Sequence, residues 1–240
     1  MSTAFEHVVL EALDPAAQAR WWADALGWTI GYQDDEEVDL DGPQLRLVFV
    51  PVPRHAPSRG RLHLDLASRD ADHQRSLVAQ LLAAGARRAD VGQGDVPWEV
   101  LADPEGMVFC VLEPRAVYAD AGPVAALVLQ AADPEALARF WRAATGWERA
   151  DTELVALRGR SGGPYLELYP VSEPAYGADH RVHLDVRPLP GSPQAAEVSR
   201  LRGLGAAPLD VGQGDVPWVV LADPEGNPFC VLSTPSGSGA

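Results

Sequence analysis

The chain has 240 residues, 47% of them hydrophobic and 22% charged, which is typical of an ordered globular protein. Its formal charge of −15, with arginine but no lysine, would repel nucleic-acid phosphates and anionic lipids, so neither nucleic acid nor a membrane is an expected partner. We find no apolar run of roughly eighteen residues and no signal-like start, and therefore expect a cytoplasmic protein. The two cysteines, Cys110 and Cys230, provide no disulfide framework.

The first part of the chain predicts one strand, one helix and then three strands. Residues 5–13 form an apolar strand-like run, and Asp14 is placed as the N-cap of a helix from Pro15 to about Leu26, which Gly27 ends. Strand-like runs follow at 28–32, 37–40 and 45–52.

The same order of elements then returns. RLHLDLAS at 61–68 begins a second cycle, with a helix near 71–84 that ends at Gly85. A tight turn at 103–106, with Gly106 in the left-handed position, joins strands at 98–102 and 108–112. This order of strands and helices predicts an α+β fold.

The second half of the chain repeats the first. VGQGDVPWEVLADPEG at 91–106 returns as VGQGDVPWVVLADPEG at 211–226, and RLHLDL at 61–66 returns as RVHLDV at 181–186. Further upstream, residues 14–28 match 133–147. We therefore predict domains at 1–115 and 123–235, a short join at 116–122 and a tail at 236–240.

Side chains alternate between the two faces of a strand, so the apolar positions predict which face meets the helices. In RLHLDL the leucines pack on the helix, which turns Arg61, His63 and Asp65 the other way. These three side chains could form a buried hydrogen-bonded cluster or part of a ligand site. The same reasoning turns inward His7, Val9, Glu11, Cys110, Leu112, Arg181, His183, Asp185, Cys230 and Leu232.

Trp98 and Trp218 follow the repeated VGQGDVP loops, where they could stack on a ligand or cover the end of the fold. The loops themselves are interpreted as turns, because no helix follows their glycines as a phosphate-binding loop requires. A cysteine nucleophile is not favoured, because Cys110 lies on a predicted strand rather than at a helix start.

Several motifs resemble those of one known family. His7 precedes Asp14 by the same spacing that separates His63 from Asp70, and a DPEG turn lies near the end of each copy. Both halves resemble the bacterial glyoxalase-like branch of the vicinal-oxygen-chelate superfamily over nearly the whole chain. The resemblance implies two βαβββ modules in each copy, which form incomplete barrels with helices outside and a cavity for a small organic molecule inside.

The resemblance also implies where a metal would bind. Metal-dependent relatives carry His on the first strand, Glu on the fourth, His on the fifth and Glu on the last. Matched to these positions, the first copy offers His7, Arg46, His63 and Cys110, and the second offers Ala126, Glu167, His183 and Cys230. If the copies exchange modules, the sets become His7, Arg46, His183, Cys230 and Ala126, Glu167, His63, Cys110.

None of these sets is complete, and the guanidinium of Arg46 would repel a divalent ion. We therefore expect no cofactor. The alternative is a metal such as zinc, iron, nickel or manganese held by His7, His63 and Cys110.

Two functional hypotheses follow. In the first, the chain binds a small organic molecule for sequestration or resistance. In the second, it is a glyoxalase-type lyase or isomerase or a dioxygenase with its active site in the first domain. Without a metal, His63 polarised by Asp65 would move protons, and Arg46 or Arg61 would hold a carboxylate or enolate.

The oligomeric state is open, as a monomer with two packed domains or a homodimer. In one reading the second copy only completes a shared barrel, in place of the homodimer of single-domain relatives. The candidate ligand-contacting residues are His7, Glu11, Arg46, Arg61, Trp98, Cys110, Glu167, His183, Asp185 and Trp218.

Overall fold

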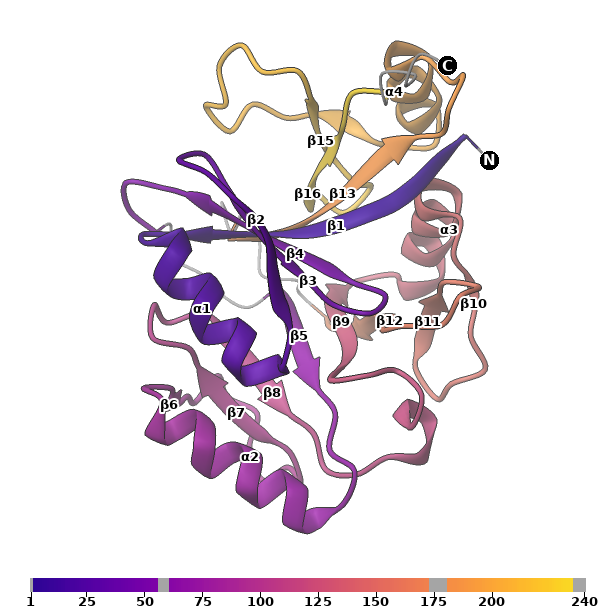
Figure 1. Cartoon of the computed structure of the whole chain (residues 1–240). Helices are drawn as coiled ribbons and strands as arrows, with labels where there is room; N and C mark the ends of the chain where they lie inside the picture. Colours follow the sequence, from indigo (N-terminus) through magenta and orange to yellow (C-terminus); the bar gives the residue numbers. More distant parts are fainter. Residues whose placement is uncertain (1, 56–60, 173–180, 235–240) are drawn as a thin grey trace.

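The computed structural model describes residues 2–55, 61–172 and 181–234. Within these ranges the chain forms two eight-stranded sheets and four α-helices (Figure 1). The predicted α+β class and the order of the elements are confirmed. No helix in the described ranges combines the length and apolarity needed to cross a bilayer.

Sheet A has the strand order β14-β15-β16-β13-β1-β4-β3-β2, so among the described strands its edges β14 and β2 do not pair with each other. It takes its strands from the beginning and the end of the chain. Those from the beginning are β1 (Thr3–Ala12), β2 (Thr29–Gln33), β3 (Val38–Asp41) and β4 (Arg46–Pro51), and those from the end are β13 (Val182–Pro188), β14 (Ala207–Pro208), β15 (Val219–Ala222) and β16 (Pro228–Val231).

Sheet B has the strand order β10-β11-β12-β9-β5-β8-β7-β6 and is built from the middle of the chain. The end of the first copy supplies β5 (Leu62–Leu66), β6 (Arg87–Arg88), β7 (Glu99–Ala102) and β8 (Val108–Val111). The start of the second copy supplies β9 (Val124–Ala131), β10 (Glu148–Arg149), β11 (Val155–Arg158) and β12 (Tyr165–Pro170).

The two copies therefore exchange modules. β1 pairs with β13 of the second copy in antiparallel register, with Val8 opposite Leu184. β5 pairs with β9 in the same way, with Leu64 opposite Leu127. The sequence left two pairings open, within one copy or between the copies. Each sheet contains one module from each copy, so the pairing is between the copies.

The helices are α1 (Pro15–Leu26), α2 (Ala71–Ala83), α3 (Pro134–Thr145) and α4 (Gln194–Gly203), and a short 3-10 helix, η1 (Ala116–Tyr118), lies in the predicted join. The predicted caps of α1 are present. The Asp14 carboxylate accepts a hydrogen bond from the backbone N–H of Ala17, and Gly27 is left-handed at φ 67°. Gly106 of the DPEG turn is also left-handed, and its N–H donates to the Asp103 carbonyl, as predicted.

One face of each sheet packs into a shared apolar core. Trp22 of α1 packs edge-to-face on Phe109 of sheet B, and Trp141 of α3 does the same on Phe229 of sheet A. Both indoles are fully buried and donate to buried carboxylates, Trp22 to Asp103 and Trp141 to Asp223. Each of these helices thus connects the two sheets, and the opposite face of each sheet remains for a site.

Candidate functional site

The face of sheet A that points away from the shared core carries most of its buried polar side chains, and we call it the polar face of sheet A. The alternation is as predicted, because Val8 and Leu10 enter the core. Its central members are His7, Val9, Asp39, Val48, His183, Asp185 and Cys230.

A carboxylate lies between two imidazoles at the centre of this face. His7 Nε2 lies 3.0 Å from Asp185 Oδ2, and His183 Nε2 lies 3.5 Å from Asp185 Oδ1. The β1–β13 register causes this arrangement, because His7 is directly opposite Asp185 and Val9 is opposite His183. Such an array can hold a proton and bind hydrogen-bonding groups.

Within the described residues, two buried atoms of this array have no hydrogen-bond partner. These are His7 Nδ1 and Asp185 Oδ1, and Asp39 Oδ1 on the neighbouring β3 shares this property. Buried polar atoms normally find partners, and those that do not mark places where a bound group would be stabilised.

Acidic side chains on β3 and just before it border the array. Burial raises the pKa of the Asp39 carboxyl, and the nearby Arg46 guanidinium partly offsets this rise in pKa. Burial and the charge of Asp39 likewise raise the pKa of the Glu37 carboxyl. Arg46 itself bonds Asp41 at 2.7 Å and Asp39 at 3.2 Å at the edge of the face, where its side chain is 45% exposed.

The corresponding polar face of sheet B has the same plan and different members. They are His63, Asp65, Cys110, Ala126, Val128, Tyr165 and Glu167. His63 Nε2 lies 3.4 Å from Asp65 Oδ1, but Ala126 occupies the place of His7, so the second imidazole of the array is missing. In its stead Glu167 brings a buried carboxyl, and burial raises the pKa of that carboxyl.

Tyr118 covers this face of sheet B. Its hydroxyl donates to Glu167 Oε1 at 2.6 Å, and its ring packs edge-to-face on Tyr165. Trp98 is half-buried beneath the guanidinium of Arg115, whereas its counterpart Trp218 in sheet A is 38% exposed. The two tryptophans therefore lie in different surroundings despite identical flanking loops.

The strand register shows that Arg46 and Glu167, which the sequence analysis treated as equivalent positions of the two copies, are not equivalent. Val9 of β1 lies opposite Val48 of β4, and the equivalent Val128 of β9 lies opposite Glu167 of β12. The counterpart of Glu167 is thus Val48, and that of Arg46 is Tyr165. The sequence match slipped by two residues because LRL and LEL look alike, and a slip of two preserves the predicted facing.

Arg61 and Arg181, predicted to face the cavity, contact the DPEG turns of the opposite sheets. Arg61 is buried, donates to the Glu225 carbonyl at 2.8 Å and lies 3.7 Å from the Glu225 carboxylate. Arg181 donates to the Glu105 carbonyl. Both arginines therefore connect one sheet to the DPEG turn of the other.

The glutamates of the two DPEG turns also accept hydrogen bonds from the segments that precede α1 and α3. Glu105 accepts hydrogen bonds from the backbone N–H groups of Leu13 and Asp14, just before α1, and from His55. Glu225 accepts equivalent bonds from Ala132 and Asp133 before α3. These residues hold the sheets together and have a structural role.

The structure does not support the metal set His7, His63 and Cys110. His7 lies on sheet A, whereas His63 and Cys110 lie on sheet B, because the copies exchange modules. With the corrected register, the four family positions are occupied by His7, Val48, His183 and Cys230 in sheet A and by Ala126, Glu167, His63 and Cys110 in sheet B. Each set contains one hydrocarbon side chain and a cysteine, so the four-ligand pattern does not fit either sheet.

A smaller ligand set is present in both sheets. Potential ligand atoms of His63, Asp65 and Cys110 lie within 4.8 Å of one another, as do those of His183, Asp185 and Cys230. Burial, and then the adjacent aspartate, raise the pKa of both thiols, so the neutral thiol is favoured in the metal-free protein.

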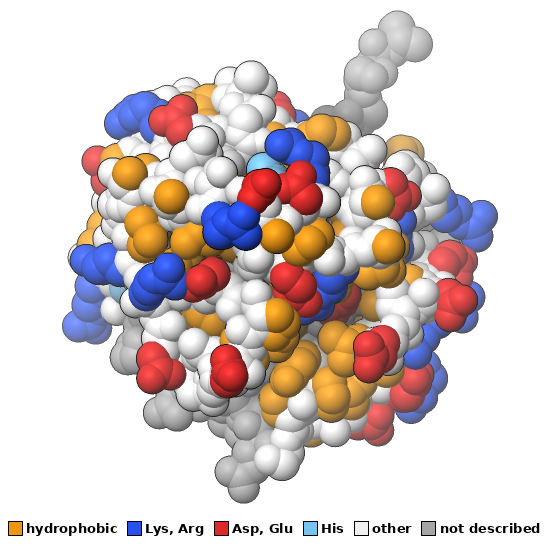
Figure 2. Space-filling view, turned by 90° about the horizontal axis from the view of Figure 1, so that it is seen from below, with side chains coloured by type: hydrophobic (Ala, Val, Ile, Leu, Met, Phe, Trp, Pro, Cys, Tyr) orange, Lys and Arg blue, Asp and Glu red, His pale blue; other side chains and the backbone are white. Residues whose placement is uncertain are grey.

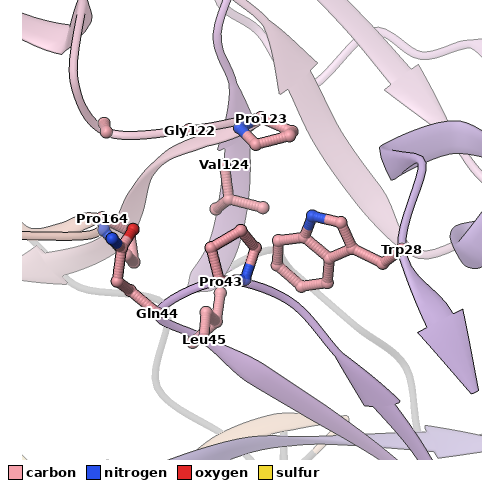
Figure 3. A pocket seen from close by; sticks show the side chains of 9 residues that line it. Trp28, Pro43, Gln44, Leu45, Gly122, Pro123, Val124 and Pro164 are labelled. Atoms are coloured by element: carbon pink, nitrogen blue, oxygen red, sulfur yellow. The ribbon is translucent and has the colours of Figure 1, made fainter. Parts of the chain in front are cut away.

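The remaining predicted residue, Glu11, is half-buried near the end of β1. Outside the polar faces, a small hollow lies at the seam between the sheets, where the Trp28 ring lies against Pro43 (Figure 3). Its lining has no titratable side chain, so it offers no chemistry. Acidic and basic side chains are interspersed on the surface seen in Figure 2.

Sequence reasoning did not single out Tyr118, Arg115, Tyr165 or Asp39. The first two lie in or beside the join at 116–122, which has no periodic pattern to interpret. The one available signal was the presence of a large aromatic residue in a short connecting segment.

These sheets, their exchanged modules and their paired polar faces define a class of protein. The sequence matches the model of the glyoxalase-like domain at residues 7–112 and again at 126–232, and the chain belongs to this family, within the vicinal-oxygen-chelate superfamily.

Two solved structures that span nearly the whole chain share its fold. Glyoxalase I from Zea mays is 16% identical, with a TM-score of 0.62 over 97% of this chain and 92% of that chain. A putative dioxygenase from Bacillus subtilis is 14% identical, with a TM-score of 0.59 over 98% of this chain and 86% of that chain. A bleomycin resistance determinant encoded on transposon Tn5 is 19% identical and covers 46% of this chain and 97% of its own, with a TM-score of 0.34. No curated protein matches the sequence.

Proposed function

We propose that the chain binds a small organic molecule on the polar face of sheet A and acts in the cytoplasm by sequestering it. The observation that carries this proposal is the His7–Asp185–His183 array, in which the buried His7 Nδ1 has no hydrogen-bond partner among the described residues. A ligand with a hydrogen-bonding group would supply that partner and be stabilised by it.

The difference between the sheets supports the choice of sheet A. On sheet B the chain's own Tyr118 already donates to the buried carboxylate of Glu167. On sheet A the equivalent position is Val48, and Trp218, just before β15, is 38% exposed and so available to contact a bound molecule. We therefore assign one ligand site to each chain.

A second candidate function is proton-transfer catalysis at the same place. It is favoured by the 3.0 Å contact between His7 and Asp185, which resembles a base held by a carboxylate. His7 would accept a proton from the ligand, and Asp185 would stabilise the imidazolium that forms. No step through a metal is derived, because the four-ligand set does not fit.

The duplication offers a matched pair of variants for the test. Asp185→Asn alters the array of sheet A, and Asp65→Asn makes the same change in sheet B. Each protein would be incubated with the protein-free small-molecule fraction of a cell extract and analysed by native mass spectrometry. We expect wild type and Asp65→Asn to retain a non-covalent organic molecule and Asp185→Asn to lose it.

Retention that survives Asp185→Asn but disappears in Asp65→Asn would contradict the assignment to sheet A. Chemical conversion of the retained molecule by wild type, abolished by His7→Gln, would favour the catalytic alternative over sequestration.

A further inference from the structure

The segment that joins the two copies packs on the polar face of sheet B. Tyr118 is only 6% exposed and belongs to the apolar cluster of that face. Its neighbours in the cluster come from five strands and include Val100, Cys110, Ala126, Val128, Ala156 and Tyr165. The phenol ring is therefore enclosed as a bound aromatic ligand would be.

One polar contact orients the enclosed ring. The Tyr118 hydroxyl donates to Oε1 of Glu167, whose side chain is almost completely buried at 3% exposure. The hydrogen bond from Tyr118 lowers the pKa of the Glu167 carboxyl and so opposes the larger effect of burial. An isolated buried carboxylate is costly, so the donor at this point stabilises the whole face.

Further contacts hold the joining segment in place. The Tyr165 hydroxyl donates to the Val117 carbonyl at 3.1 Å, and the Arg158 guanidinium contacts the Asp120 carboxylate at 3.0 Å. Arg115 places its guanidinium 5.9 Å from the centre of the Tyr118 ring. The segment thus bonds to the residues of the face as well as to itself.

We propose that the polar face of sheet B is a binding site for a phenol, and that Tyr118 is its tethered occupant. The recognition elements are apolar walls, an aromatic edge and one deep acceptor, which together fit a ring that carries a single hydroxyl donor. This inference concerns sheet B and does not depend on the ligand proposed for sheet A.

The arrangement is specific to one of the two sheets. Sheet A has Val48 in the place of Glu167, so it lacks the deep acceptor. The sequence that corresponds to residues 115–118 in the second copy is PSGS at 235–238, which contains no aromatic residue and lies outside the described residues.

Removal of the ring tests the proposal. In Tyr118→Ala the space left by the tyrosine ring would accept p-cresol, which reproduces the tyrosine side chain. A cavity with apolar walls that is as large as an aromatic ring admits small aromatic molecules. We expect p-cresol to raise the melting temperature of Tyr118→Ala and to leave that of wild type unchanged. Tyr169→Ala, which removes a tyrosine that is 46% exposed on the same strand as Glu167, is the matched control and should not respond.

The hydroxyl gives the test its chemical specificity. A hydrogen bond to a charged group contributes about 1.5–3 kcal/mol, so p-cresol should bind Tyr118→Ala roughly ten- to hundredfold more tightly than toluene. This preference should disappear in Tyr118→Ala combined with Glu167→Leu. Equal affinity for p-cresol and toluene, or no binding of either to the folded variant, would overturn the proposal.

Should Tyr118→Ala fail to fold, Tyr118→Phe decides the matter. This variant keeps the ring but removes the donor that lowers the pKa of Glu167, so that pKa rises further. A raised folded-state pKa of a carboxyl means that stability is lost as pH rises through it. The melting-temperature deficit of Tyr118→Phe should therefore widen with increasing pH, and a deficit independent of pH would overturn the role of Glu167.

Discussion

The polar faces of sheets A and B share one plan but differ in what completes them. Both contain a histidine, an aspartate two residues later and a cysteine, all contributed by C-terminal modules that share the segments VGQGDVPW and VLADPEG. The N-terminal modules have diverged. The position of His7 in the first copy is Ala126 in the second, and the position of Val48 is Glu167. Since the copies exchange modules, each sheet combines one preserved and one divergent module. The divergent module supplies the side chains in which the two polar faces differ.

The largest predicted effects lie in the core, where the two halves should be equivalent. Trp22→Ala and Trp141→Ala each remove a fully buried indole that donates to a buried aspartate. Each substitution should lower the free energy of unfolding by about 3–5 kcal/mol, measured by urea denaturation. A large loss in one variant and a small loss in the other would show that the sheets differ in their cores as well as in their polar faces.

A smaller effect should distinguish the faces by their pH dependence. Burial raises the pKa of Glu167, so its contribution to stability is present at low pH and lost as pH rises through that pKa. Glu167→Gln keeps an acceptor for Tyr118 but removes the titrating carboxyl. The free energy of unfolding of the variant should therefore rise relative to that of wild type as pH increases, by on the order of 1 kcal/mol.

Denaturation curves at several pH values measure this gain. Glu153→Gln, which changes an exposed carboxyl in the same module, should follow wild type. If Glu167→Gln also follows wild type across the pH range, Glu167 does not titrate as its burial requires.

The smallest expected effect concerns metal. The incomplete ligand sets lead us to expect less than stoichiometric metal in protein purified without chelator. His63→Ala and His183→Ala should therefore leave the metal content, measured by mass spectrometry of the elements, unchanged. Stoichiometric zinc, iron, nickel or manganese that is lost in one variant would assign a metal site to that sheet.

The sequence predicted the elements well, because their signals are local. Asp14 and Gly27 mark the ends of α1, and the leucines of RLHLDL show which face meets the core. The pairing of modules was not predictable, because the strands of the two copies carry the same pattern and can pair with either partner.

The candidate site was predicted only in part. The sequence identified His7, His183 and Asp185 as inward-facing, but their meeting in one array depends on the exchange of modules. The contact of Arg61 with Glu225 was not predictable, because the two residues are distant in the sequence. The cover provided by Tyr118 depends on the path of the join, for which no periodic pattern exists.

The central claim is that each chain has one ligand site open to an external molecule, on sheet A, whereas Tyr118 fills the face of sheet B. The most direct test is the stoichiometry of the molecule recovered from the extract, titrated into wild-type protein and followed by native mass spectrometry. We predict saturation at one molecule per chain, with binding lost in Asp185→Asn and kept in Asp65→Asn. Saturation at two molecules per chain, or loss of binding in Asp65→Asn alone, would contradict the account.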